Sequence, residues 1–374
     1  MAAVDVIILH PLAAESAGPL ERRLAEARAD LAERHIRGFP AAGAETGRIR
    51  AGLPDGRPFG ERVRALLVDH PRGHGLILLG SGALPLATAG DRRAFVVAAA
   101  ADGARALANN RFSADAIALT GEAVASLDRL PTDLPGDNAL PRWLDESAGV
   151  PVDDLRTRWR LGVDFDSPLD VLLVEQAQAP GGRGGRGGRV GRGFVVDSRV
   201  EAALEGIRRV MADPHAELVI AGRSSAATLA WLERATRCRV RALIEERGLR
   251  ASSRLVPAEP DPTSASPDAA RRPRSVLGLV LDRDGPEALG DRLAELGDAA
   301  VVDSRVLLAH RLGTDERLWP SAEDRFSSDL LDPEAVADPW LRALTASAAG
   351  ARIPVVLGGH TLVGPGVRLV AGGR

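Results

Sequence analysis

Lysine and tyrosine are absent from this 374-residue sequence, and cysteine occurs once. All 48 basic residues are therefore arginines. Without lysine there is neither a Schiff-base lysine nor the lysine of a phosphate-binding P-loop, which excludes pyridoxal enzymes and Walker-type nucleotide hydrolases that depend on that residue. Arginine binds phosphate through two nitrogens but is a poor general base, so acid–base chemistry must come from Asp, Glu, His or Cys238.

Long apolar runs and a second cysteine are also missing. A single cysteine excludes a disulfide framework and any zinc site built from several cysteines, and it is typical of a reducing compartment. No run approaches the roughly 18 apolar residues that a membrane helix needs. The start, MAAVDVIILHPL, has no basic region before its apolar run, so we interpret Val4–Leu9 as a β-strand rather than a signal peptide. We therefore expect a cytoplasmic protein with no membrane partner.

Charge and composition bound the remaining classes of protein. The formal net charge of -3 and the pI of about 6.2 provide no positive field that would recruit nucleic acid. A hydrophobic content of 45% is typical of a globular protein with a buried core. Because 374 residues exceed the size of a typical single domain, two domains are expected.

Short apolar runs alternate with amphipathic stretches in both halves of the chain. This alternation predicts two α/β domains, each a mostly parallel sheet flanked by helices. Thr88, three residues before Asp91, predicts the N-cap of a helix. The first domain has expected strands at Val4–Leu9, Gly75–Leu79, Ala116–Leu119 and Leu161–Phe165, and expected helices at Leu20–Ile36, Phe59–Val68, Asn138–Ser147 and Val152–Trp159. The second has expected strands at Glu217–Ala221, Val240–Ile244, Val276–Leu281, Ala299–Val302, Ile353–Leu357 and Val367–Val370, and expected helices at Val200–Met211, Ser225–Ala235, Pro286–Leu296 and Pro333–Ala348.

Residues 180–193 separate the two halves by composition. Their sequence, PGGRGGRGGRVGRG, has almost no apolar side chain and cannot contribute to a packed core. We interpret it as a flexible linker between a first domain, residues 1–179, and a second domain, residues 194–374. Arg-Gly repeats also bind RNA through charge and stacking, which leaves RNA binding open as an alternative. The segment has no interleaved aromatic residue and belongs to an acidic chain, which favours the linker.

Three motifs follow one another in the first domain. GRPFGERVRALL (Gly56–Leu67) opens a helix, and GLILLGSGALPLATAGDRRAFV (Gly75–Val96) predicts a strand, a loop and a capped helix. LGVDFDSPLDVLLV (Leu161–Val174) places Asp164 and Asp166 at the end of an expected strand. This order resembles the glycosyltransferase-A-like nucleotidyltransferase superfamily, in which the domain closes with a D-x-D-T-P-x-D junction between a strand and a helix. DFDSPLD corresponds to that junction.

The resemblance implies a nucleotide-diphospho-sugar-transferase-like first domain and a transferase that acts on a nucleotide or nucleotide sugar and a small-molecule acceptor. Asp164 and Asp166 would be the catalytic residues and would hold Mg²⁺ or Mn²⁺, since hard cations prefer carboxylate oxygens. The partner would be a nucleotide or another phosphorylated small molecule. The Asp-Ser-Pro sequence also fits a plain helix N-terminus with Ser167 as its cap and Pro168 at the first helical position.

Two departures from the superfamily leave a non-catalytic role open. The first strand runs into HPLAAESAGPLERR, which has no Gly-rich loop with a lysine to hold a triphosphate. The mid-domain Asp of the superfamily falls at GSGALP (Gly80–Pro85), where no carboxylate is available for a cation. The alternative is therefore a degenerate domain that binds a nucleotide or phosphometabolite without catalysis.

Polar residues in three connections are candidates for contacting the nucleotide. Polar loops beside strand ends are where α/β proteins bind ligands. The same residue types also form turns, so a purely structural role stays open for each. The candidates are Ser81, Gly82, Asn109, Asn110, Arg111, Asp137 and Asn138.

The second domain contains one candidate anion site. In ELVIAGRSSAATLAWLERA an expected strand is followed by a Gly-Arg-Ser-Ser turn and a helix. The N–H groups of a helix start, the Arg223 guanidinium and the hydroxyls of Ser224 and Ser225 together can hold an anion, although Ser is also an ordinary cap at this position. His310 and His360 have no metal-binding spacing, so we interpret them as structural or exposed.

Overall fold

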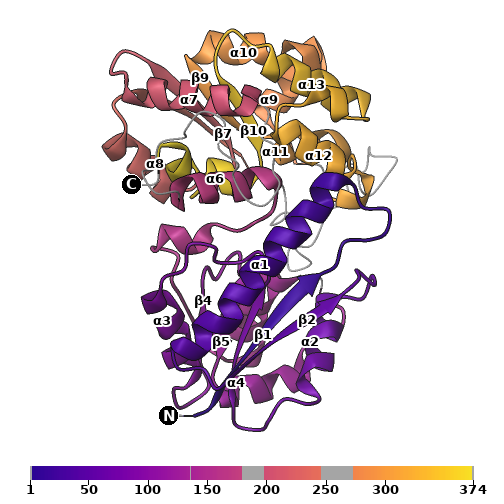
Figure 1. Cartoon of the computed structure of the whole chain (residues 1–374), viewed down its shortest axis with the longest axis vertical. Coiled ribbons are helices and arrows are strands. Elements are labelled where there is room, and N and C mark those ends of the chain that lie inside the picture. The colour runs from indigo at the N-terminus through magenta and orange to yellow at the C-terminus, as the bar shows by residue number, and fades with distance from the viewer. Residues whose placement is uncertain (1, 135, 179–197, 246–272, 373–374) are drawn as a thin grey trace. The chain divides into compact units, whose positions relative to one another are not determined.

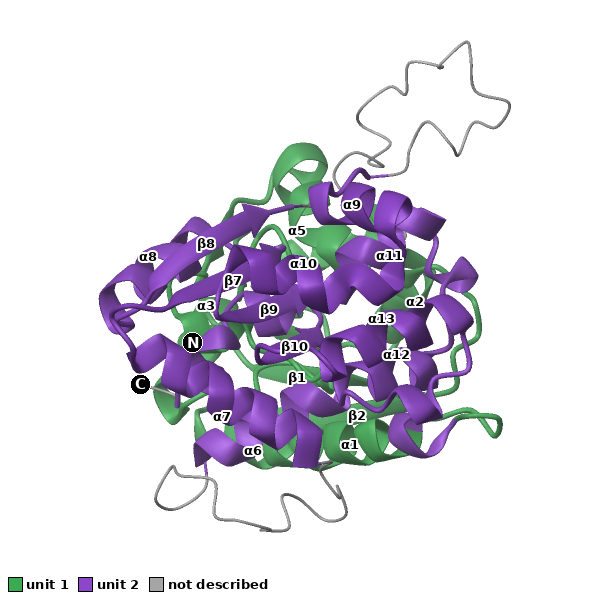
Figure 2. Ribbon diagram, turned by 90° about the horizontal axis from the view of Figure 1, so that it is seen from above, with its two compact units in different colours: residues 1–17, 22–165 green, residues 18–21, 166–374 purple. Residues whose placement is uncertain are grey.

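The computed structural model describes residues 2–134, 136–178, 198–245 and 273–372. The chain divides into two compact units, coloured green and purple in Figure 2. Unit 1 contains residues 1–17 and 22–165, and unit 2 contains residues 18–21 and 166–374. Each unit has a mostly parallel sheet flanked by helices, which confirms the predicted α/β class. None of the described helices has both the length and the apolar character that crossing a membrane requires.

The sheet of unit 1 has six strands in the order β2-β1-β3-β5-β4-β6. Figure 1 labels β1, β2, β4 and β5 of this sheet. Strand β5 runs antiparallel to its neighbours β3 and β4, and the other neighbouring pairs are parallel. Ile8 of β1 lies beside Ile49 of β2 and Leu79 of β3. The carboxyl ends of these three parallel strands therefore share one edge of the sheet. The strands are β1 (Val4–Pro11), β2 (Thr46–Gly52), β3 (Gly75–Gly80), β4 (Ala106–Ala108), β5 (Ala116–Leu119) and β6 (Val152–Asp154).

Both faces of the sheet of unit 1 are covered by helices. Successive side chains of a strand point to opposite faces, so neighbouring residues of β1 belong to different cores. Ile8 packs in a cluster with Phe39 of α1 and Phe95 of α3. Ile7 packs in the other cluster, with Phe59 of α2. The first five helices are α1 (Pro19–Ala41), α2 (Phe59–Leu67), α3 (Ala89–Ala99), α4 (Gly121–Ser126) and α5 (Leu140–Trp143).

Two predicted elements of unit 1 are wrong. Val152–Trp159, expected as a helix, contains strand β6, which pairs in parallel with β4. Leu161–Phe165, expected as a strand, overlaps the 3-10 helix Trp159–Gly162 and contributes only an isolated bridge between Asp164 and Ala83. Short apolar runs fit several local structures, and in both cases the available backbone partner decided the outcome.

The sheet of unit 2 has four parallel strands in the order β10-β9-β7-β8. The strands are β7 (Glu217–Gly222), β8 (Arg239–Ile244), β9 (Ala299–Asp303) and β10 (Val355–Gly358). The helices are α6 (Pro168–Gln178), α7 (Ser198–Ala212), α8 (Ala226–Ala235), α9 (Val276–Asp284), α10 (Leu289–Leu296), α11 (Ser304–Leu312), α12 (Ala322–Asp329), α13 (Pro339–Ala349), α14 (His360–Val363) and α15 (Val367–Val370).

Two expected strands of unit 2 are helices. Val276–Leu281 lies in α9, where the Ser275 hydroxyl caps the helix by accepting a hydrogen bond from the N–H of Gly278 at 2.9 Å. Val367–Val370 forms the short helix α15. Each run contains two valines, and the strand preference of such β-branched residues is weak enough for a local cap or tertiary packing to override it.

The division between the units falls before helix α6. The Gly/Arg segment 180–193, where the sequence predicts the linker, lies outside the described residues. Helix α6 nevertheless belongs to unit 2, because it packs against α12 and α15 and the seven residues Pro168–Val174 are all buried. The first unit therefore ends at Phe165 and not at residue 179.

Candidate functional site

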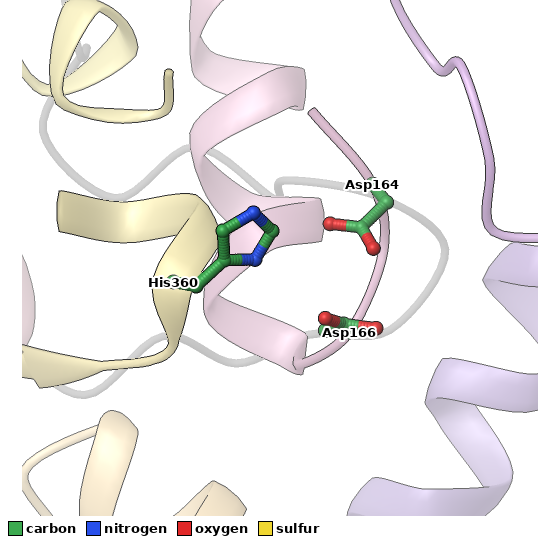
Figure 3. A group of neighbouring side chains, drawn as sticks. All are labelled: Asp164, Asp166 and His360. Carbon is green, nitrogen blue, oxygen red and sulfur yellow. The ribbon is translucent and has the colours of Figure 1, made fainter. Parts of the chain in front are cut away.

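Three potential cation ligands come together beside the start of α6. Asp164 and Asp166 are separated only by Phe165, and His360 is the first residue of α14, directly after β10. One ligand atom from each of the three side chains lies within 4.8 Å of the others. In Figure 3 the imidazole faces the segment that carries the two carboxylates. Asp164 is buried, His360 is partly buried and Asp166 is exposed, so the group is accessible from one side.

The helix N-terminus that the sequence predicts beside these aspartates is formed by Ser167 and Asp170. The Ser167 hydroxyl accepts a hydrogen bond from the N–H of Asp170 at 3.4 Å. In return the Asp170 carboxyl accepts hydrogen bonds from the N–H groups of Asp166 and Ser167, at 3.1 and 2.7 Å. Burial, and then the charge of Asp166, raise the pKa of Asp170 to about 8. Asp170 is thus a buried cap that holds the backbone of Asp166 in place.

The ligand set favours certain cations over others. Carboxylate oxygens bind Mg²⁺, Ca²⁺ and Mn²⁺, whereas an imidazole nitrogen suits transition ions and is a poor ligand for Mg²⁺. Two carboxylates with one imidazole therefore fit Mn²⁺ or another first-row ion better than Mg²⁺. The sequence predicts the two aspartates as ligands, but it does not predict His360, because no spacing connects it to them. The only local signal is that His360 directly follows a strand.

A positive charge also lies next to this segment. The Nε–H of Arg28, on α1, donates a hydrogen bond of 2.7 Å to the carbonyl of Phe165, the residue between the two aspartates. Gly82 leaves the space for this approach, since a Cβ there would lie 3.2 Å from the Arg28 Nε and 3.1 Å from the same carbonyl. The guanidinium is therefore held within unit 1 beside the backbone of Asp164.

A cleft of about 650 Å³ opens at the carboxyl ends of β1, β2 and β3. Apolar side chains from the sheet, α2 and α5 form much of its lining, and they include Leu9, Phe59, Leu66, Leu78, Ile117 and Leu140. Three arginines and four aspartates contribute the charged part of the lining. This mixture of apolar surface and a few polar groups, in a volume within the ~300–1,000 Å³ range of small-molecule sites, is what a ligand pocket requires.

A histidine and a serine meet beside this cleft. His10 ends the buried part of β1, and Ser81 is the residue after β3. The Nδ1 atom of His10 lies 3.0 Å from the Ser81 hydroxyl oxygen. The sequence predicts Ser81 as a ligand contact but not His10. The pair forms because Leu9 and Gly80 are register partners in adjacent parallel strands, so the next residue of each strand lies at the same edge.

The other predicted nucleotide contacts lie mainly in turns. Asn109 is buried, and its side chain bonds to Asp115, to the Leu161 carbonyl and to the N–H of Ala116. Asn110 accepts a hydrogen bond from the N–H of the residue two positions later, as in an Asx turn. Arg111 forms an ion pair with Asp145, and the N–H of Asn138 donates to the Asp137 carboxylate. Of the seven predicted residues, Asp137 alone is part of the cleft lining.

The residues of the predicted anion site in unit 2 also have protein partners. The Arg223 guanidinium donates two hydrogen bonds to the buried carboxylate of Asp303, at 2.5 and 3.0 Å. Burial opposes the charge of Asp303, but Arg223 holds the pKa of that carboxyl below its usual range. Ser225 caps α8, and the Ser224 hydroxyl has no hydrogen-bond partner among the described residues. Asp303 therefore neutralises the positive charge of Arg223 that would otherwise attract an anion.

Two further side chains that could take part in chemistry, His310 and Cys238, have structural roles in unit 2. His310 accepts a hydrogen bond from the N–H of Ser275 through Nδ1, and its Nε2 lies 2.9 Å from the carboxylate of Asp282. Cys238 is buried, and burial raises the pKa of its thiol, which keeps the sulfur protonated and weakly nucleophilic. Neither residue faces a described cleft.

No protein-family model matches this chain, and no curated protein matches it either. The site residues, their contacts and their charges are therefore what supports a function.

Proposed function

We propose that the protein is a nucleotidyl- or glycosyltransferase-like enzyme that binds a nucleotide or nucleotide sugar with a divalent cation and acts on a small-molecule acceptor. The support for this is the grouping of Asp164, Asp166 and His360 within 4.8 Å. The motif resemblance assigns the two aspartates to a cation, and their carboxylates adjoin a third ligand from a distant part of the chain. Two carboxylates with an imidazole form a ligand set for a divalent transition ion.

The cation would neutralise phosphate oxygens and stabilise the charge that develops as a phosphoryl or sugar bond breaks. Any fixed positive charge beside it must come from arginine, since the chain has no lysine. Arg28 supports this role, because its guanidinium is held next to the carbonyl between the two aspartates. Guanidinium groups bind phosphate oxygens through several N–H donors. Arg28 would thus stand in for the lysine that the sequence lacks.

The cleft of unit 1 would hold the organic part of the ligand. Its apolar lining suits a base or sugar ring, and its polar groups can orient that ring. Asp164 lies at the same end of the sheet. Its backbone pairs with Ala83, and Ala83 is three residues after Gly80, which lines the cleft. Strand ends of an α/β sheet are where such ligands bind.

Thermal unfolding of the full chain with MnCl₂, MgCl₂ and nucleotides tests this proposal. We expect Mn²⁺ to raise Tm more than Mg²⁺, because the imidazole disfavours Mg²⁺. A cation at a hundredfold excess over its Kd stabilises the folded state by about 2.7 kcal/mol. Asp166→Ala and His360→Ala should each abolish most of the Mn²⁺ shift, and Asp102→Ala, which replaces an exposed aspartate outside the group, should retain it. A Tm that no cation changes would contradict the proposal.

A non-catalytic nucleotide-binding protein is the second candidate function. It is favoured by the segment GSGALP, which offers no carboxylate for a cation, and by the lack of a Gly-rich loop with lysine. Release of pyrophosphate or nucleoside diphosphate from nucleotides and nucleotide sugars, in the presence of Mn²⁺ and candidate acceptors, separates the two. Turnover that Asp166→Ala abolishes supports the transferase, and cation-dependent binding without turnover supports the binding protein.

A further inference from the structure

The contact between His10 and Ser81 determines which ring nitrogen carries the proton. Both side chains are buried, with 8% and 1% of their surface exposed. Their 3.0 Å contact is the only hydrogen bond that either side chain makes to the described residues. A buried hydroxyl must donate its proton or leave it unpaired, and the Nδ1 atom of His10 is the acceptor within reach. The pair is satisfied when Ser81 donates to Nδ1, which places the ring proton of His10 on Nε2.

The surroundings also keep this imidazole uncharged. Burial lowers the pKa of His10, and the positive charge of Arg28 lowers it further. With Nδ1 occupied by the Ser81 proton, the ring has no free lone pair for accepting a proton from a ligand. His10 is thus a neutral N–H donor at pH 7 and not a general base.

Because Nδ1 of His10 faces Ser81, Nε2 is the ring nitrogen left for a ligand of the cleft. His10 is part of the cleft lining, whereas Ser81, which occupies Nδ1, is not. The three arginines of the lining are outnumbered by its four aspartates, so the cleft has no excess of positive charge for a phosphate. An uncharged donor beside apolar side chains is best matched by an uncharged acceptor, such as a carbonyl oxygen.

We propose that His10 selects the ligand of this cleft by donating a hydrogen bond to an uncharged carbonyl oxygen, with Ser81 as the positioning residue that fixes its tautomer. This inference rests on the proposed function, and there it means that a base with a ring carbonyl binds in preference to its amino counterpart. An amino group at the same position would place two N–H donors against each other and leave both unpaired. We expect discrimination of about tenfold or more.

Binding of four uncharged nucleosides to the full chain, without a cation, measures this selection. Uridine is compared with cytidine and inosine with adenosine, by ligand-observed NMR titration. At least one carbonyl nucleoside should bind about tenfold or more tightly than its amino partner. His10→Leu should remove the preference, and His10→Gln should weaken it, because the amide offers an acceptor as well as an N–H donor. The matched control is His215→Leu, which replaces an exposed histidine of unit 2 and should leave the preference unchanged.

The tautomer is measured separately by nitrogen-15 NMR of the histidine rings without ligand. The Nε2-protonated form should predominate for His10 at pH 7, and Ser81→Ala should increase the Nδ1-protonated form. The inference is overturned by an Nδ1-protonated ring in the unsubstituted chain, by equal binding within both nucleoside pairs, or by a preference that persists in His10→Leu. Loss of the Mn²⁺ response in the unsubstituted chain, with the nucleoside preference intact, would instead overturn the cation part of the proposed function.

Discussion

At the scale of single residues, the stability of unit 1 depends on buried groups whose charge is determined by their partners. Asp91 is the clearest case, because it is 1% exposed and still ionised. Burial would raise the pKa of its carboxyl, but hydrogen bonds from Arg160, Thr88 and Arg158 together lower it. The same carboxylate completes a capping box with Thr88 at the start of α3.

Replacing Asp91 by alanine should lower the free energy of unfolding by about 2 kcal/mol. The substitution removes the acceptor of two arginines, which would cost about 3–5 kcal/mol if they were buried. The side chains of Arg158 and Arg160 remain 38% and 33% exposed, so water compensates part of the loss. Thr88→Ala, which removes only the cap, should cost about 1 kcal/mol. Urea unfolding followed by circular dichroism measures both, and equal midpoints for Asp91→Ala and the unsubstituted chain would contradict the assignment.

His35 should make the protein less stable as the pH falls. Its ring is fully buried, and Nε2–H donates to the Ala83 carbonyl at 2.9 Å. Burial lowers its pKa from 6.5 to about 4, so between these values the unfolded chain binds a proton that the folded chain does not. Unfolding is then favoured by acid, by about 3 kcal/mol at most. His35→Leu should have a shallower loss of stability between pH 6.5 and 4 in urea unfolding, whereas His215→Leu should retain the original slope.

At the scale of elements, helix N-caps are the feature that the sequence predicts most directly. The pair of Thr88 and Asp91 predicts the start of α3 correctly, and the structure forms the complete capping box. The sequence does not predict strand β2, because TGRIRAG is polar and no residue of this edge strand is buried. The apolar run Val276–Leu281 predicts a strand, although Ser275 before it is an ordinary helix cap. In this segment the N-cap residue and the apolar composition predict different structures, and the N-cap residue predicts the observed one.

The start of α6 gives a prediction at this scale. Asp170→Ala should lower the free energy of unfolding by about 1–2 kcal/mol, because the N–H groups of Asp166 and Ser167 lose their acceptor. Asp170→Asn should cost less than half of that at pH 7. With a pKa of about 8 the carboxyl is protonated at this pH, and a neutral amide oxygen accepts the same hydrogen bonds. Equal losses in urea unfolding for the two variants would show that the charge, and not the acceptor, matters.

At the scale of the whole molecule, the boundary between the units predicts which fragments fold. A fragment of residues 166–374 should be soluble and melt cooperatively, because it retains α6 against α12 and α15. A fragment of residues 180–374 lacks the seven buried residues Pro168–Val174, so it should expose the apolar surface they cover and aggregate. Size-exclusion chromatography and thermal circular dichroism compare the two. A stable, monomeric 180–374 fragment would place α6 outside the second fold.

The sequence by itself determined the α/β class, most buried strands, the cap of α3 and the neighbouring aspartates Asp164 and Asp166 before α6. These features depend on short windows, in which side-chain periodicity, capping and the order of residues are directly encoded. Only the tertiary structure brought His360, after β10, to Asp166, before α6, and His10 to Ser81 at the ends of β1 and β3, since each contact joins segments far apart in the sequence. Strand order results from packing summed over a whole core, so no local pattern contains it.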